Sequence, residues 1–470
     1  MRSAPGADLT MVLVTENQPS HGQEPAPAAG KEGRPRAFAW TAAAAAGFLA
    51  SLGLIGADAL WLVPTGGEVA HGRVPGSVPF ATAASSGWRD VPAGGELIFW
   101  AAYHALGEGR GLLALQALAA AIAFGALAHG LGREASSGSA LAVCGITLAG
   151  SLPAVLLAGA STFSLALFPV LLALLEGESR APSRRIWLVV PLLALWGNLH
   201  GGVLSGWALL ACFLLFELGP RRPAQAASLL VAATVALGAN AELWHTPSYY
   251  RRVFASVPAR DGIALWSPLH LDFVGVLLLV ALAVLAGLAV VRHVRPRLWE
   301  LVALIGLAAG TIHVERSGDW LLFVAAYPAV RALRLGAPRP RLLIVASAAL
   351  AVFAVFSLLS DPIPAPSERI AALAARTGRP LLADAVLGQL AAIDGGRVWV
   401  DDPIDAFRPA DQRLYLDWIQ GKPEGRPAVD HASYVLVQTD SPAGKRAATD
   451  KRLRRIAHAG TAALYRVRGR

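Results

Sequence analysis

The sequence predicts an α-helical membrane protein that crosses the bilayer about eleven times and ends in a small α/β domain. Of its 470 residues, 55% are hydrophobic and 16% are charged, whereas a soluble protein carries about 25% charged residues. Several apolar runs reach the roughly 20 residues that a helix needs to cross a bilayer. Such runs must satisfy their backbone hydrogen bonds internally, which favours helices, and they do not alternate as the short strands of a barrel do.

The charge and cysteine content argue against several other classes. The net charge of +9 gives no support for nucleic acid binding, because the basic residues are spread over short loops between apolar runs. The two cysteines, Cys144 and Cys212, each lie within an apolar run. This predicts buried thiols and no disulfide framework or metal cluster. We expect no cofactor, and a divalent metal requirement stays open.

The chain divides into three parts. Residues 1–36 are rich in Pro, Gly, Ala and Glu, which predicts a disordered cytoplasmic tail. Residues 37–360 form the multi-span domain, whose first span, 37–56, we interpret as an uncleaved anchor, with a cleaved signal peptide as the alternative. The other spans are expected at 111–130, 138–158, 162–176, 186–197, 201–218, 223–239, 270–291, 298–313, 319–333 and 341–360. The short segment 96–106 is expected to lie flat at the membrane interface.

Residues 361–470 have a different character, with more charge and shorter apolar runs. Strands are expected at 381–383, 398–400, 434–437 and 463–467, and helical patterns fall between them at 385–393, 409–420 and 444–458. Strands that alternate with helices predict a small parallel sheet. The segment has no Gly-rich phosphate motif, so it favours docking or acceptor recognition over nucleotide binding.

Arginines indicate the orientation of the spans. They concentrate in alternate turns, at 133, 180–185, 221–222, 292–297 and 331–341. Since cytoplasmic loops carry an excess of Lys and Arg, the N-terminus is expected in the cytoplasm. The first long loop, 57–95, and residues 361–470 are then expected on the outer face.

Four polar segments share this predicted outer face. They are the loop 57–95 with the start of the next helix (Asp58, Trp61, Glu68, His71, Trp88, Asp90 and Glu96), the turn 198–202 (Asn198 and His200), the loop 240–269, and residues 313–320 with Arg316. Polar side chains at membrane depth are costly and tend to be functional. The simpler alternatives are a solvated connector, a tight turn between helices and an interfacial salt-bridge cluster.

The order of several short motifs resembles a known family. The motifs are Asp58-Ala59-Leu60-Trp61, Thr65-Gly66, Gly72-Arg73-Val74-Pro75, Pro79-Phe80, Trp88, the turn LWGNLHGG at 195–202, Ile263–Pro268, Arg316, Val398–Asp402 and Asp405–Phe407. From Asp58 onward the chain resembles bacterial polytopic membrane proteins related to the GT-C glycosyltransferases. These enzymes take sugars from polyprenyl-phosphate donors.

The resemblance implies a site and a reaction. Asp58 would act as general base on an acceptor hydroxyl, and Arg316 would hold the leaving lipid phosphate. His200 or Asn198 would orient acceptor or phosphate, and Asp58, His200 and Arg316 are expected to approach one another. The remaining substrate-binding candidates are Trp61, Glu68, His71, Trp88, Asp90 and Glu96. The donor would be a polyprenyl-phosphate-linked sugar within the membrane lipid, and the acceptor a glycan, lipid or protein at the outer face of the cytoplasmic membrane.

Three departures from the family pattern keep an alternative open. Val78, Val91-Pro92 and Gly159-Ala160-Ser161 stand where the family usually keeps acids or cations. A non-catalytic homologue that binds lipid-linked glycan or scaffolds cell-envelope assembly is therefore the second hypothesis. A transporter is disfavoured, because no internal repeat is visible and the polar segments gather at one surface.

The predicted orientation has a direct test. Alkaline phosphatase fused after Arg470 should be active, because the C-terminus is expected outside the cytoplasmic membrane. Green fluorescent protein fused at the same residue should stay dark. The reverse pattern would place the C-terminus in the cytoplasm. It would contradict the prediction that the four polar segments lie on the outer face.

Overall fold

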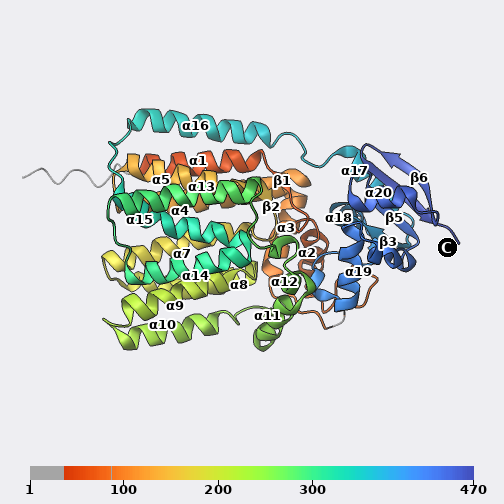
Figure 1. Ribbon diagram of the computed structural model, residues 1–470, viewed down its shortest axis with the longest axis horizontal. Helices are drawn as coiled ribbons and strands as arrows, with labels where there is room; N and C mark the ends of the chain where they lie inside the picture. The colour runs from red at the N-terminus through yellow and green to blue at the C-terminus, as the bar shows by residue number, and fades with distance from the viewer. Residues whose placement is uncertain (1–35, 86, 470) are drawn as a thin grey trace, which may run out of the picture. The chain divides into compact units, whose positions relative to one another are not determined.

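The computed structural model describes residues 36–85 and 87–469. The predicted disordered tail, 1–36, lies outside the described residues apart from Arg36, at which the first helix begins. Figure 1 shows that helices make up most of the chain and that a group of strands follows the last long helix.

A helix lies at each of the eleven segments expected to cross the membrane. They are α1 (Arg36–Ser51), α4 (Gly109–Leu131), α5 (Ser137–Gly150), α7 (Thr162–Arg180), α8 (Val189–Leu199), α9 (Val203–Phe213), α10 (Pro223–Ala236), α13 (Phe273–Val291), α14 (Leu298–His313), α15 (Gly318–Ala332) and α16 (Pro340–Ser357). Among the described residues, 4 of these helices, α4, α7, α13 and α16, are long and apolar enough to cross a membrane. The number of spans stays a prediction.

Aromatic rings and small residues hold these helices together. The ring of Phe323 on α15 has its centroid 5.6 Å from that of Phe124 on α4 and 6.3 Å from that of Phe168 on α7. Where α1 meets α4, a Cβ on Gly47 would lie 3.2 Å from the carbonyl oxygen of Ala117. A small residue at this point lets the two helix backbones approach closely, as is common between membrane helices.

The helix α16 is attached differently, because none of its residues is buried. It lies beside α1 (Figure 1) and is joined to it by hydroxyl pairs. Thr41 and Ser347 are 3.0 Å apart at their side-chain oxygens, and Ser51 and Ser357 are 2.5 Å apart. Its apolar side chains are therefore left to face lipid.

Shorter elements connect the long helices to the strands. They are β1 (Leu54–Ile55), α2 (Leu62–Ala70), α3 (Ala93–Leu106), α6 (Leu152–Leu156), β2 (Leu157–Ala158), η1 (Arg184–Leu188), η2 (Leu214–Leu218), η3 (Leu243–His245), α11 (Thr246–Ala255), α12 (Val257–Asp261), η4 (Ala264–Trp266) and η5 (Glu315–Ser317). The segment expected to lie flat at the interface is α3, and its place relative to the membrane stays a prediction. Phe99 and Tyr103 are buried, because α3 packs against α2 and α8.

The last part of the chain forms a five-stranded sheet with helices around it. Its elements are α17 (Ala365–Ala375), β3 (Pro380–Ala383), α18 (Ala385–Ile393), β4 (Arg397–Val398), η6 (Ile404–Ala406), α19 (Pro409–Ile419), η7 (Pro423–His431), β5 (Tyr434–Gln438), α20 (Pro442–Thr449), β6 (Leu453–Ala459) and β7 (Ala462–Val467). The strand order is β4-β3-β5-β7-β6.

The prediction of a parallel sheet is wrong at strand β7. β3 is parallel to β4 and β5, but β7 is antiparallel to both β5 and β6. β6 lies in the segment 444–458 that was expected to be helical. It is an edge strand whose Arg454, Arg455 and His458 are exposed, and such charged edges lack the apolar alternation of a central strand.

The first long loop adds a short segment to this sheet. The N–H of Val398 donates to the carbonyl of Phe80 at 3.0 Å, and the N–H of Thr82 donates to the carbonyl of Val398 at 2.7 Å. The N–H of Ala83 then donates to the carbonyl of Trp399 at 2.9 Å. The loop 57–95 and the sheet therefore share one hydrophobic core.

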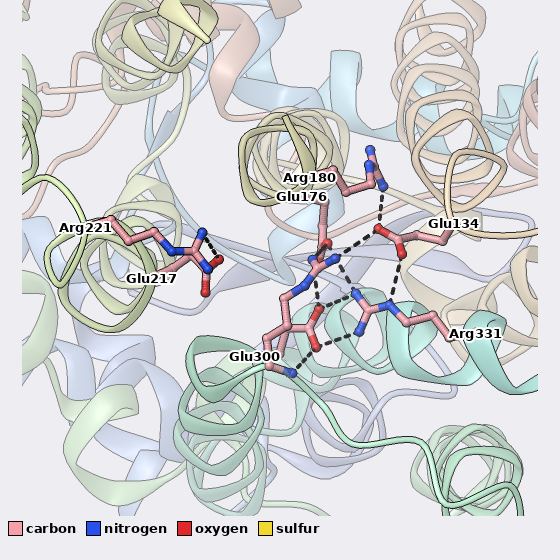
Figure 2. A network of polar contacts seen from close by, with 8 residues as sticks. Glu134, Glu176, Arg180, Glu217, Arg221, Glu300 and Arg331 are labelled. Atoms are coloured by element: carbon pink, nitrogen blue, oxygen red, sulfur yellow. Dashed lines mark hydrogen bonds and ion pairs between the residues drawn. The ribbon is translucent and has the colours of Figure 1, made fainter. Parts of the chain in front are cut away.

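At the other end of the long helices, three arginines and three glutamates form a buried network (Figure 2). Arg331 of α15 reaches Glu300 at 2.5 Å, Glu134 at 3.1 Å and Glu176 at 3.3 Å. Arg180 pairs with Glu134 at 2.5 Å, and Arg297 pairs with Glu176. The formal charges of these six side chains cancel, and the network joins α7, α14, α15 and the turn after α4.

We expect Arg331→Met to lower the melting temperature of the detergent-solubilised protein. Removing one partner of a buried ion pair leaves charges uncompensated and costs about 3–5 kcal/mol. The matched control is Arg334→Met, since Arg334 is exposed and makes no hydrogen bond or ion pair to any described residue. Equal melting temperatures for the two variants would contradict a stabilising role of the network.

Candidate functional site

A short pair of parallel strands positions Asp58. β1 pairs with β2, and the N–H of Gly56 donates to the carbonyl of Ala158 at 2.7 Å. The chain then turns, and the carboxylate of Asp58 lies against Gly159, where an added Cβ would be 2.3 Å from Oδ1. Gly159 therefore leaves the space that the carboxylate occupies.

The surroundings of Asp58 make its carboxylate a stronger base than usual. The side chain is half-buried. Burial raises the pKa of Asp58, and the charge of Arg316 and hydrogen bonds from the backbone of Asp58 and Ala160 oppose this rise. A raised pKa favours acceptance of a proton near neutral pH.

Gln389 of α18 holds the turn that carries Asp58. Its Nε2 donates to the carbonyl of Ala57 at 2.5 Å, and its Oε1 accepts from the N–H of Trp61 at 3.2 Å. Nε2 also donates to Oδ1 of Asp401 at 2.9 Å, which fixes the orientation of the amide. Gln389 and Asp401 are fully buried, so the turn is fastened on both sides of Asp58 by the C-terminal part of the chain.

Arg316 lies on η5, between α14 and α15. Its guanidinium carbon is 4.7 Å from the ring centroid of Trp266, which is a cation–π contact. The N–H of Glu315 donates to the carbonyl of Ser267 at 3.0 Å and so holds η5 beside η4. Among the described residues none forms a hydrogen bond or ion pair with the guanidinium, which leaves its donors available to an anionic ligand.

His200 follows the last residue of α8, and its partners determine its tautomer. Nδ1 accepts a hydrogen bond from the N–H of Gly202 at 3.2 Å and lies 2.6 Å from Oγ of Ser164. Oγ of Ser164 accepts from Nε1–H of Trp196 at 2.8 Å, so the hydroxyl proton is free to point toward Nδ1. Since Nδ1 is an acceptor, the neutral imidazole carries its proton on Nε2.

Electrostatics keep His200 neutral and connect it with Arg316. Burial, and then the positive charge of Arg316, lower the pKa of His200 to about 3. At neutral pH the imidazole therefore presents Nε2–H as a hydrogen-bond donor. The charge of Arg316 acts on both His200 and Asp58, so the structure brings these three predicted residues together.

Two acids from the C-terminal part and a tyrosine lie beside them. Burial raises the pKa of Asp402, and the carboxylates of Asp401, Asp58 and Asp405 add to this rise. Burial raises the pKa of Asp405 to about 6. Burial, and then the charge of Asp405, also raise the pKa of Tyr249 on α11. We call Asp58, His200, Tyr249, Arg316, Asp402 and Asp405 the Asp58 cluster.

Asp90 and Glu96 form a buried pair whose charges also act on Tyr249 of the Asp58 cluster. Both are 0% exposed, and neither carboxyl group has another hydrogen-bond partner among the described residues. Burial raises the pKa of Asp90 to about 7 and that of Glu96 well above its usual value. The two groups contact each other, which is the arrangement of carboxyls that share one proton. Their burial places them inside the protein and away from solvent, and their predicted substrate-binding role stays a prediction.

Three further predicted site residues pack or join elements. Trp61 and Trp88 are buried and meet edge to face, with ring centroids 6.4 Å apart. Asn198 joins α8 to the end of α10, because its Nδ2 donates to the carbonyls of Ala194 at 2.8 Å and Ala239 at 2.6 Å. These contacts explain the positions of the three residues, and no ligand is needed to explain them.

Glu68 and His71 lie near the end of α2, where their contacts are local. Glu68 pairs with Arg73 at 2.8 Å, and Nδ1 of His71 is 2.6 Å from the carbonyl oxygen of Gly67. The structure does not bring either residue into the Asp58 cluster.

Carboxylates able to share a metal ion lie elsewhere. In residues 36–85 and 87–469, one group of acids has suitably close oxygens, and it consists of Glu108, Asp361 and Glu368. None of these belongs to the Asp58 cluster. The expected absence of a catalytic metal or cofactor stays a prediction.

Several residues of the site were not among the predicted ones. Gln389 lies within an ordinary helical pattern, so the sequence carries no signal for its role. Asp401 and Asp402 form an acidic pair after a strand, and Tyr249 lies in the polar loop 240–269. These features could have marked the three residues as candidate site residues. Ser164 was hidden because its partner His200 is 36 residues away in the sequence.

Gly159→Ala should lower the melting temperature, because the new methyl group would occupy the space of the Asp58 carboxylate. Overpacking of this kind costs about 1–3 kcal/mol. Gly145→Ala is the matched control, since a Cβ at Gly145 meets nothing within 4 Å. A helix-interior Gly→Ala change is expected to be neutral or stabilising. Thermal melting of both variants in detergent gives the comparison.

The fold is shared with a protein of solved structure, ArnT. ArnT from Cupriavidus metallidurans bound to undecaprenyl phosphate matches with a TM-score of 0.53 and 13% identity, over 91% of this chain and 97% of that chain. ArnT in the apo state matches with a TM-score of 0.51 and 14% identity, over 91% and 96% of the two chains. No family model and no curated protein sequence matches this chain. The likeness to ArnT confirms the resemblance to GT-C glycosyltransferases at the level of the fold.

Proposed function

We propose that this protein transfers a sugar from a polyprenyl-phosphate donor to an acceptor hydroxyl. The observation that carries the proposal is the Asp58 cluster, in which a half-buried carboxylate lies near the unpaired guanidinium of Arg316. The fold shared with ArnT, which was solved with undecaprenyl phosphate, supports a polyprenyl-phosphate ligand.

The proposed reaction is a single displacement at the anomeric carbon. The carboxylate of Asp58 takes the proton of the acceptor hydroxyl, and the hydroxyl oxygen forms a bond with the anomeric carbon. The bond between that carbon and the phosphate oxygen breaks, and the lipid phosphate leaves with the electron pair. Arg316 stabilises the growing negative charge through its planar donors.

The other members of the cluster have distinct proposed roles. The Nε2–H of His200 is a fixed neutral donor beside Arg316, which suits a phosphate oxygen. Asp402 and Asp405 come from the C-terminal part of the chain and suit recognition of hydroxyl groups on the acceptor. We place the reaction at the outer face of the cytoplasmic membrane, with a glycan, lipid or protein as the acceptor.

A second candidate function is binding without transfer. At Gly159, where the family usually keeps a polar group, this chain has only a hydrogen atom beside the Asp58 carboxylate. A homologue with fewer catalytic groups could hold a lipid-linked glycan or scaffold envelope assembly. Variants of Asp58 distinguish sugar transfer from binding without transfer.

Asp58→Asn should reduce sugar transfer by about 10²–10⁴-fold, because it removes the proton acceptor and keeps the side-chain shape. The assay uses the purified full-length protein and a panel of radiolabelled polyprenyl-phosphate sugars. Asp440→Asn is the control, since Asp440 is an exposed acid of the same kind. Wild-type transfer by Asp58→Asn at equal expression would exclude catalysis by Asp58 and favour the binding homologue.

The transfer rate should fall as the pH drops, along an acid limb to which protonation of Asp58 contributes. Burial raises the pKa of this carboxyl, so the limb should lie above the usual value of about 3.9. His200 should add no limb near pH 6.5, because its pKa of about 3 keeps it neutral throughout. A pH–rate profile of the wild-type protein tests both statements. An acid limb near 6.5 that disappears in His200→Gln would contradict the assigned roles.

A further inference from the structure

An apolar groove lies between α16 and the two helices nearest to it, α1 and α4. It has a volume of about 590 Å³, and most of the residues that line it are alanines. The groove exists because these side chains are too small to fill the space beside α16, which has no buried residue of its own. Figure 1 shows α16 beside α1 along most of its length. We call this space the α16 groove.

The α16 groove is about as long as one leaflet of a bilayer. α1 and α16 run in the same direction, since Thr41 pairs with Ser347 and Ser51 pairs with Ser357. The lining residues of α1 fall within 37–48, which corresponds to a rise of about 16 Å along a helix. Half of the hydrocarbon core of a bilayer is about 15 Å thick. The length of the groove therefore suits one acyl chain of a membrane lipid.

The interior of the groove offers no free polar group to an occupant. Ser347 lines it, and its hydroxyl donates to the carbonyl of Leu343 at 2.7 Å. Toward the far end, the ring of Phe48 has its centroid 6.2 Å from that of Phe353 on α16. Phe48 is the last lining residue of α1, so the groove ends where these two rings meet. An apolar chain of limited length fits such a space.

The opposite end, where α1 and α16 begin, carries unpaired positive charge. Arg339 directly precedes α16, and Arg341 lies in its first turn. Both side chains are exposed, and neither forms a hydrogen bond or ion pair with a described residue. Arg341 comes three residues before Ile344 and seven before Ala348, so it shares their face of the helix, which lines the groove. Two cations at the end of an apolar groove are complementary to a lipid with an anionic headgroup.

An exposed tryptophan lies at this same end. Trp40 lines the groove about one turn after α1 begins, and it is 68% exposed. Tryptophan is enriched at the level of the lipid headgroups, and basic residues beside clefts between membrane helices recognise anionic headgroups. Trp40 and Arg341 therefore place the start of the groove at headgroup level and its remainder beside the acyl chains.

We propose that the α16 groove binds an anionic phospholipid, with an acyl chain along the groove and the phosphate at Arg339 and Arg341. The lipid fills the space between α16 and its neighbours and so fastens a helix that the protein itself does not bury. No residue of the Asp58 cluster lines the groove, so this site is separate from the proposed sugar transfer and does not depend on it.

The test compares thermal melting of the full-length protein in detergent with phosphatidylglycerol, with phosphatidylcholine or without added lipid. Phosphatidylglycerol should raise the melting temperature in a concentration-dependent way, because a ligand of the folded state stabilises it. Phosphatidylcholine with the same acyl chains should give a smaller shift, because its headgroup has no net charge. Native mass spectrometry should show one retained phosphatidylglycerol on the wild-type protein.

One variant tests the groove itself. Ala348→Phe should lose most of the phosphatidylglycerol shift, because the larger side chain occupies the groove. The matched control is Ala349→Phe, since Ala349 is the next residue of the same helix, is exposed and does not line the groove. This control should keep the full shift.

A second variant tests the headgroup site and decides the question if Ala348→Phe fails to fold. Arg339→Gln combined with Arg341→Gln should weaken the apparent affinity for phosphatidylglycerol roughly 25-fold, since each basic residue near anionic headgroups contributes about fivefold. The control combines Arg184→Gln with Arg185→Gln, two exposed arginines of the turn after α7, and should keep the wild-type affinity.

Three results would overturn the proposal. The first is an equal shift with phosphatidylglycerol and phosphatidylcholine, which would leave the two arginines without a role. The second is an equal phosphatidylglycerol shift in Ala348→Phe and Ala349→Phe. The third is a larger shift with undecaprenyl phosphate that Ala348→Phe abolishes, because the groove would then hold a polyprenyl chain instead of a phospholipid.

Discussion

The hydrogen bonds of Gln389 are the interaction on which the candidate site depends. One buried amide contacts the backbone at Ala57 and at Trp61, and its orientation is fixed by Asp401. An amide in this position cannot lose one partner without leaving a buried polar group unsatisfied. The conformation of the turn that carries Asp58 therefore depends on the packing of α18 against it. Helix α18 lies more than 300 residues later in the sequence. The membrane helices alone do not complete the site.

The two ends of the long helices differ in how their arginines are paired. Arg331 is surrounded by three carboxylates, and every charge of that network is matched within the protein. Arg316 has an aromatic face as its neighbour and no ion pair in the described chain. A matched charge stabilises the protein, whereas an unmatched one retains its capacity to bind an anion. The end of the bundle with Arg316 is therefore the one suited to bind an anionic ligand.

Sequence reasoning was most effective where one physical rule dominates. Apolar length predicted the helices, and alternation of arginine-rich turns predicted that Asp58, His200 and Arg316 belong to the same end. The rules failed where tertiary contacts decide. The charged edge strand β6 has no apolar alternation, and the burial of Asp90 and Glu96 depends on the packing of α3. Gln389 is informative only once its partners are known, because a glutamine within a helix is common.

The attachment of the loop to strand β4 has a consequence for handling the protein. One edge of the sheet is covered by residues 80–83, and the other edge, β6, is protected by exposed arginines. A fragment of residues 361–470 would keep the charged edge strand β6. It would lack residues 80–83, which cover the other edge of the sheet at β4. The bare amides and carbonyls of β4 would then be free to pair with another chain. Such a fragment is expected to self-associate through β4 unless the residues 80–83 are supplied to it, for example as a peptide.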